Sequence, residues 1–146
     1  MENKGQTRIK SMCLLVDEDR RILLGKGYDR VKNEHFYRVL GGSLNFGESA
    51  EECVRREIRE ELNCEIENLE ALETINNEFV YNGKEGHETV HLFKGNVSNK
   101  GLEKKKKVRI IEDAYEFDAE WVSIKNVFEK KATLYPVFDY EKFLQI

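Results

Sequence analysis

Residues 41–64 of this 146-residue chain read GGSLNFGESAEECVRREIREELNC, and this stretch carries the strongest prediction of the fold. Ser49 and Glu52 have the spacing of a capping box, in which each side chain binds the backbone N–H of the other residue at the start of a helix. Asn63 is, after glycine, the residue best suited to the left-handed conformation that commonly ends a helix. The stretch therefore predicts a helix from about Ser49 to Leu62, reached through a loop that begins at two glycines.

The predicted helix carries acidic residues on its apolar face. At about 100° per residue, Glu57 and Glu61 fall inside the stripe of apolar side chains that should pack against a sheet, and Glu60 lies at its flank. Burying unpaired carboxylates costs free energy, and a cluster of them adds mutual repulsion. Oxygen ligands at this density suit Mg²⁺ or Mn²⁺, so the pattern favours a divalent metal site over a helix that is merely salt-bridged.

The charged positions of this stretch resemble the Nudix box, the signature of the Nudix hydrolase family. Gly42, Glu48, the pair Arg56-Glu57 and the pair Glu60-Glu61 stand at the spacing of that motif, which here spans residues 42–64. Every charged position of the pattern is present. The resemblance covers about a sixth of the chain and implies that the whole chain is an enzyme of this family.

Two positions depart from the family pattern. Asn63 stands where a glycine is usual, and Cys64 stands where an aliphatic residue is usual. Asparagine tolerates a positive φ, so the helix is expected to end in the same way. Neither change removes a charged position, and the chemistry of the motif is therefore expected to be intact.

The resemblance implies a role for each residue of the motif. The implied catalytic and metal-binding set is Arg56, Glu57, Glu60 and Glu61 with the carbonyl of Gly41, while Gly42 and Glu48 support the loop. Arg56 would orient Glu57 through a charge-assisted hydrogen bond. The implied reaction is attack of a metal-activated water on one phosphorus of a pyrophosphate bridge, with Mg²⁺ or Mn²⁺ as the cofactor.

A general base is also required, and the sequence leaves its identity open. In this family the base is either a glutamate of the motif or an acid from a later loop. Several acids precede Trp121 and any one of them qualifies: Glu112, Asp113, Glu116, Asp118 and Glu120.

Residues outside the motif are candidates for substrate contacts. Tyr37 and Phe79 are aromatic and could stack on a nucleobase, and His87 follows a glycine-containing turn. Arg38 lies on the strand that leads into the motif and is a candidate for a phosphate contact. Ordinary core packing of the two aromatic residues, and a hairpin position without a role for His87, remain open as alternatives.

The remainder of the chain is predicted as strands with short helices. Strands are predicted over residues 8–15, 21–25, 36–40 and 119–122, a hairpin over 72–81 and 88–96 around a turn at 82–86, and helices over 123–130 and 136–144. Residues 104–107 are four lysines, predicted as a solvated charge run in a loop or at a strand edge. Strands before, between and after helices indicate the α/β class. The resemblance implies the Nudix fold, a mixed β-sheet sandwiched between α-helices, as one domain over residues 1–146.

The composition excludes several classes of protein. No apolar run is long enough to span a membrane, and the N-terminus lacks the apolar segment of a signal peptide, so a cytoplasmic protein without a membrane partner is expected. The net charge of −4 argues against a stable nucleic-acid complex. The three cysteines have no zinc-binding spacing and are expected to be reduced. Homodimers are common in families of this architecture, and no apolar stripe in the sequence identifies an interface.

These observations predict hydrolysis of a pyrophosphate bond in a nucleoside diphosphate that is linked to another moiety. The substrate is a nucleotide-type small molecule: a nucleoside triphosphate, a nucleotide sugar such as ADP-ribose, or a dinucleotide polyphosphate. The motif binds only the pyrophosphate and does not discriminate among these. A non-catalytic nucleotide sensor with the same fold is the alternative, although such a protein would be expected to have lost motif acids. An isoprenoid-type isomerase ranks lower, because its characteristic extra acid and cysteine pairing are not evident.

Overall fold

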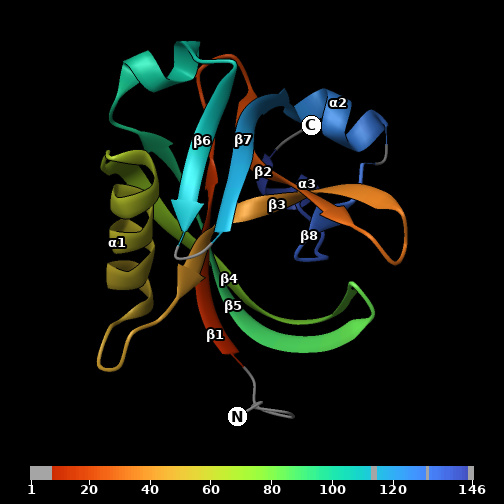
Figure 1. Ribbon diagram of the computed structural model, residues 1–146. Helices are drawn as coiled ribbons and strands as arrows, with labels where there is room; N and C mark the ends of the chain where they lie inside the picture. The colour runs from red at the N-terminus through yellow and green to blue at the C-terminus, as the bar shows by residue number, and fades with distance from the viewer. Residues whose placement is uncertain (1–7, 113–114, 131, 145–146) are drawn as a thin grey trace.

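The computed structural model describes residues 8–112, 115–130 and 132–144, and Figure 1 shows their arrangement. In chain order the elements are β1 (Arg8–Leu15), β2 (Arg21–Asp29), β3 (Glu34–Ser43), α1 (Ala50–Leu62), β4 (Ile66–Tyr81), β5 (Lys84–Val97), the 3₁₀ helix η1 (Lys100–Lys104), β6 (Lys107–Glu112), β7 (Tyr115–Ser123), α2 (Ile124–Glu129), β8 (Leu134–Tyr135) and α3 (Glu141–Leu144). None of the helices in these ranges has the length and apolar character needed to cross a membrane.

The strands form one mixed sheet in the order β4-β5-β1-β3-β2-β7-β6. β1 runs parallel to β5 and antiparallel to β3, while the other neighbours along this order are antiparallel. β3 joins two halves of the sheet, because residues 40–43 pair with β1 and residues 34–39 pair with β2, while residues 37–38 also pair with β8. The functional stretch read from the sequence begins where β3 leaves this junction.

Helices cover both faces of the sheet, with α1 on one face and α2 and α3 on the other (Figure 1). Val54 and Ile58 of α1 pack with inward residues of the central strands to form one buried cluster. Ile124 and Val127 of α2 belong to a second cluster on the opposite face. The predicted α/β architecture, a mixed β-sheet between α-helices, is confirmed.

The ends of α1 follow the predicted capping chemistry. The Ser49 hydroxyl accepts a hydrogen bond from the Glu52 N–H at 3.1 Å, and the Glu52 carboxylate accepts from the Ser49 N–H at 3.3 Å. Asn63 adopts φ 52° and ψ 43°, and its N–H donates to the carbonyl of Arg59. Both ends of α1 are therefore determined by local sequence, as expected for capping residues.

Several predicted elements differ in extent from the structure, and two of these differences have a clear local cause. The hairpin turn consists of Asn82 and Gly83 alone, because both residues adopt positive φ (50° and 78°) in the manner of a type I′ turn and the strands run directly up to it. The helix predicted over residues 136–144 is wrong in its first half, and only α3 is helical. Pro136 has no N–H, and its carbonyl accepts the hydroxyl of the buried Tyr140, which turns the chain before the helix begins. The lysine run 104–107 is exposed, as predicted, between η1 and the edge strand β6.

Candidate active site

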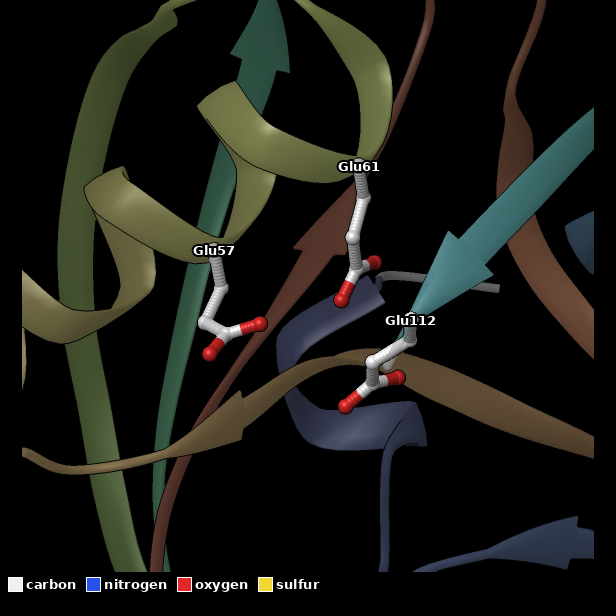
Figure 2. Close-up of side chains that lie close together, drawn as sticks. All are labelled: Glu57, Glu61 and Glu112. Atoms are coloured by element: carbon white, nitrogen blue, oxygen red, sulfur yellow. The ribbon is translucent and has the colours of Figure 1, made fainter. Parts of the chain in front are cut away.

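Three glutamates from two separate elements meet between α1 and β6. One carboxylate oxygen from each of Glu57, Glu61 and Glu112 lies within 4.8 Å of the others, and Figure 2 shows the three side chains converging on one space. Glu57 and Glu61 are only 8% and 9% exposed. This acid cluster, Glu57, Glu61 and Glu112, is the most concentrated group of oxygen ligands in the described part of the chain.

Local geometry explains how the acid cluster forms. Glu57 and Glu61 are four residues apart on α1 and therefore lie one above the other on the same helix face. On β6, Val108 and Ile110 point into the core beneath α1, and alternation along the strand places Glu112 on that same side. The helix and the strand thus present their acids to a shared space.

The glycine pair before α1 makes room for this arrangement. A Cβ atom on Gly42 would lie 2.3 Å from the carboxyl carbon of Glu57, and one on Gly41 would lie 2.0 Å from the carbonyl oxygen of Ser11. Both distances are far below contact, so neither position admits a side chain without displacing its neighbours. The two glycines let β3 pass between β1 and the Glu57 carboxylate.

Arg56 connects the loop to the acid cluster. Its guanidinium donates to Glu48 at 2.7 and 3.0 Å, to Glu57 at 2.9 Å, to Glu60 at 3.2 Å and to the carbonyl of Ser43 at 3.1 Å. The planar fork of an arginine allows these simultaneous contacts. The hydrogen bond to Glu57 is the contact through which Arg56 is predicted to orient that residue.

Glu48 serves as the partner that holds Arg56. The bidentate contact with Arg56, aided by the backbone N–H of Asn45, lowers the pKa of Glu48 to about 2. Glu48 is therefore ionised at any physiological pH and contributes a fixed negative charge to the loop. Its position matches the supporting role that the sequence suggested.

Glu61 is the acid whose surroundings fit a cation best. Both of its carboxylate oxygens are buried, and neither has a hydrogen-bond partner in the described ranges. Burial, and then the charges of Glu112 and Glu57, raise the pKa of Glu61 to about 9. A carboxylate in this position is stable as an anion only beside a positive charge, and hard oxygen donors suit Mg²⁺ or Mn²⁺. The residues present therefore fit a divalent metal ion.

A cavity of about 380 Å³ opens onto the acid cluster. Its walls are Ser43, Asn45, Arg56, Glu57, Glu60, Glu61, Ile111 and Glu112. The Glu60 side chain is 61% exposed, so this acid lies at the rim of the cavity, beyond the buried pair. The cavity is polar and combines several acids with one fixed guanidinium.

Arg38 extends from β3 toward the acid cluster and lies over the ring of Phe117. Gly25 leaves space for the ring of Phe117, since a Cβ on Gly25 would lie 2.9 Å from that ring. The Arg38 guanidinium carbon lies 4.8 Å from the centre of the Phe117 ring, and its Nη2 lies 3.9 Å from the Glu112 carboxylate. Phe117 therefore supports a second cation beside the acids.

Comparison with known proteins identifies the family. The family model described as NUDIX domain matches residues 6–140, nearly the whole chain. The chain belongs to the Nudix family. The resemblance read from residues 42–64 is confirmed.

Relatives of this Nudix chain include enzymes with different names. A stretch of 66 residues is 39% identical to an NAD-capped RNA hydrolase, NudC, of Pseudomonas aeruginosa, and takes in 45% of this chain and 23% of that protein. The fold is similar to a MutT NUDIX hydrolase from Burkholderia pseudomallei (TM-score 0.63, 20% identity, 96% of both chains). It is also similar to a mutator MutT protein from Bacillus halodurans (TM-score 0.59, 22% identity, 88% of this chain and 75% of that one). These likenesses support the Nudix fold.

The acids considered as general bases of the Nudix site occupy different surroundings. Glu116 and Asp118 pair with Arg109 at 2.8 and 3.1 Å on the outer side of the β6–β7 hairpin. Glu120 accepts the Tyr37 hydroxyl at 3.1 Å and belongs to the face covered by α2. None of these three lines the cavity. Asp113 falls outside the described residues, which leaves Glu112 as the acid of the later segment that the structure brings to the cluster.

The predicted substrate contacts outside the motif also separate. Arg38 lies beside the acid cluster, as described above. Tyr37 points to the opposite face of the sheet, Phe79 covers Gly86 within the β4–β5 hairpin, and His87 is exposed on that hairpin. None of these three lines the catalytic cavity. Successive side chains of a strand point to opposite faces of the sheet, so Arg38 and Tyr37 of β3 lie on different faces.

Proposed function

We propose that this Nudix domain hydrolyses a pyrophosphate bond in a nucleoside diphosphate linked to another moiety. The observation that carries the proposal is the buried carboxylate of Glu61, which has no hydrogen-bond partner among the described residues and belongs to an acid cluster that lines a cavity. A folded protein keeps such a group at a cost to its stability, and a function that needs the charge accounts for it. Membership of the family and the named hydrolases among its relatives support an enzyme rather than a binding module.

We assign the metal-binding role to Glu57 and Glu61, with Glu60 at the rim and the carbonyl of Gly41 as further ligands. Glu57 and Glu61 present buried oxygens, and Glu112 faces them from β6. Bound Mg²⁺ or Mn²⁺ would supply positive charge to the phosphates and lower the pKa of a water molecule. Arg56 holds Glu57 in place and keeps Glu48 and the loop fixed while the substrate binds.

We assign the general-base role to Glu112. Its side chain is 32% exposed, so water can reach it, whereas both oxygens of Glu61 are buried. A base must lie within hydrogen-bond reach of the proton it accepts, and Glu112 lines the cavity that would hold that water. The Arg38 guanidinium lies 3.9 Å from the Glu112 carboxylate, so we also assign Arg38 a contact with a phosphate of the substrate.

The candidate substrates belong to three classes: a nucleoside triphosphate, a nucleotide sugar such as ADP-ribose, or a dinucleotide polyphosphate. The P. aeruginosa relative acts, by its name, on RNA capped with NAD, whose pyrophosphate joins two nucleosides. The shared stretch takes in less than a quarter of that protein, so this likeness supports the bond that is cut and leaves the bound groups open.

A turnover screen tests the proposal. Purified protein with Mg²⁺ is incubated with nucleoside triphosphates, ADP-ribose, nucleotide sugars, NAD⁺ and diadenosine polyphosphates, and the nucleotide products are separated and quantified. Glu61→Gln is run alongside, and Glu116→Gln serves as the matched control because it removes a charge from an exposed, ion-paired acid. We expect turnover of one class, lost in Glu61→Gln by about a thousandfold and kept in the control. Equal turnover in Glu61→Gln would refute the site, and nucleotide binding without turnover would support the sensor.

A further inference from the structure

Phe46 is an apolar side chain displayed entirely to solvent. It lies in the loop between β3 and α1, and its relative exposure of 108% is the highest among the large hydrophobic residues in the described part of the chain. Single exposed hydrophobic residues are common on protein surfaces. The surroundings of Phe46 are what distinguish it.

The turn that displays Phe46 is firmly built. The Glu48 N–H donates to the carbonyl of Asn45 at 3.0 Å, and the Asn45 N–H donates to the Glu48 carboxylate at 3.0 Å. Gly47 adopts φ 78°, the conformation that the third residue of a type II turn requires. Arg56 then holds Glu48 at 2.7 Å. The Phe46 ring therefore lies on a turn that is held in place by Arg56, a residue of the cavity wall.

A second recess of about 580 Å³ lies beside this ring and shares two lining residues with the catalytic cavity. Phe46, Ile9 and Arg8 line it, and Ser43 and Asn45 form walls of both the recess and the cavity. Ile9 is 48% exposed and adds a second apolar surface. The shared residues Ser43 and Asn45 place the recess next to the cavity, within reach of a ligand that extends beyond it.

We propose that this recess is a subsite for a second aromatic ring of the substrate, a nucleobase or nicotinamide joined across the pyrophosphate. The inference rests on the proposed function. Phe46 would stack on the ring, Ile9 would form an apolar contact, and Arg8 would attract a neighbouring anionic group. Shared walls with the cavity favour the substrate as the occupant. A second copy of the chain is disfavoured, because two apolar side chains are far fewer than a stable dimer interface requires.

Kinetics with one-ring and two-ring probes test the subsite. ATP is the one-ring probe, and NAD⁺ and diadenosine tetraphosphate are the two-ring probes. We expect Phe46→Ala to raise KM for a two-ring probe roughly tenfold, with KM for ATP changed less than about twofold. Phe46→Tyr keeps the ring and should restore the wild-type KM. Val31→Ala, at another exposed apolar position 67% exposed, is the matched control and should change neither value.

Binding measurements separate this inference from the proposed function. Calorimetric titration of NAD⁺ into Glu61→Gln and into Glu61→Gln/Phe46→Ala, both with Mg²⁺, reports the subsite without turnover. A roughly tenfold weaker affinity in the double variant supports the subsite even if no probe is hydrolysed. Equal affinities, equal loss for ATP and the two-ring probes, or no binding of either two-ring probe would overturn it. A change from dimer to monomer in Phe46→Ala by sedimentation velocity would also overturn it, in favour of a chain–chain contact.

Discussion

Two groups of acids flank the β6–β7 hairpin, and they differ in exposure and in the charges that surround them. On the outer face, Arg109 pairs with Glu116 and Asp118, whose side chains are 55% and 38% exposed. On the inner face, Glu112 joins Glu57 and Glu61 of α1. Glu116 and Asp118 are exposed to solvent and paired with an arginine. Both carboxylate oxygens of Glu61 are buried and have no hydrogen-bond partner in the described ranges.

The comparison shows that a cluster of acidic residues does not by itself indicate a functional site, because the partners of the acids must also be known. Exposed ion pairs contribute about 0–1 kcal/mol to stability and serve mainly to solvate a surface. A buried carboxylate without a partner destabilises the fold, so its retention indicates a ligand that supplies the missing charge. The surroundings of the acids therefore locate the site.

Replacing one acid on each face gives the largest expected contrast. Glu112→Gln should lower kcat by about a hundredfold or more, because the proposed base can no longer accept a proton. Glu116→Gln, four residues along the same hairpin, should leave kcat within about twofold, since its carboxylate only pairs with Arg109. Steady-state kinetics on the substrate found by screening measure both. A similar loss in the two variants would place the base elsewhere.

Arg56→Lys should have a smaller effect on activity. Lysine keeps the charge but cannot contact Glu48, Glu57 and the carbonyl of Ser43 together, as Arg56 does. We expect kcat, or the Mg²⁺ concentration for half-maximal activity, to worsen by about 10- to 100-fold. Arg109→Lys is the control on the outer face and should leave both values unchanged.

The stability of the metal-free protein should depend on pH through Glu61. The folded state holds this proton up to a pKa of about 9, whereas the ordinary value is 4.5. Between these values the folded state binds more protons than the unfolded state, so the free energy of unfolding should fall as pH rises. Urea titrations at pH 5, 7 and 9 in EDTA measure the slope. Glu61→Gln should flatten it, and added Mg²⁺ should restore stability at high pH; a slope identical in wild type and variant would contradict the burial of this charge.

Removing the outer ion pairs should have the smallest effect. Arg109→Ala breaks two exposed contacts and should leave the free energy of unfolding nearly unchanged, because water solvates the released charges. Activity should be unchanged. A larger loss of stability, measured by urea denaturation, would mean that the exposed ion pairs of Arg109 stabilise the fold more than expected.

Local features of the site were predictable from the sequence. The capping box at Ser49, the left-handed Asn63 and the position of Glu57 and Glu61 on the apolar face of α1 depend on residues within four positions of one another. The charge pattern of residues 42–64 also predicted the family. Interactions of this range require no knowledge of the rest of the fold.

The choice among later acids could not be made from the sequence. Strand alternation sends Glu112 inward and Ile111 outward, but the face that each takes depends on which residues pair with β7 and on where β6 packs against α1. A shift of one residue would have exchanged the two faces. The extents of the hairpin strands and of α3 were likewise misjudged, because a two-residue turn and the packing of Tyr140 decide them.

Local sequence patterns were therefore sufficient to predict helix α1, its caps, the acids on its apolar face and the family of the chain. The packing of distant segments places Glu112 beside Glu57 and Glu61, keeps Glu116, Asp118 and Glu120 away from the cavity, and gives Phe46 a recess that shares lining residues with the cavity. The two kinds of feature differ in the sequence separation of the residues that determine them. Helix periodicity and capping act within a turn or two, whereas the packing of α1 against β6 depends on strand register across the whole sheet.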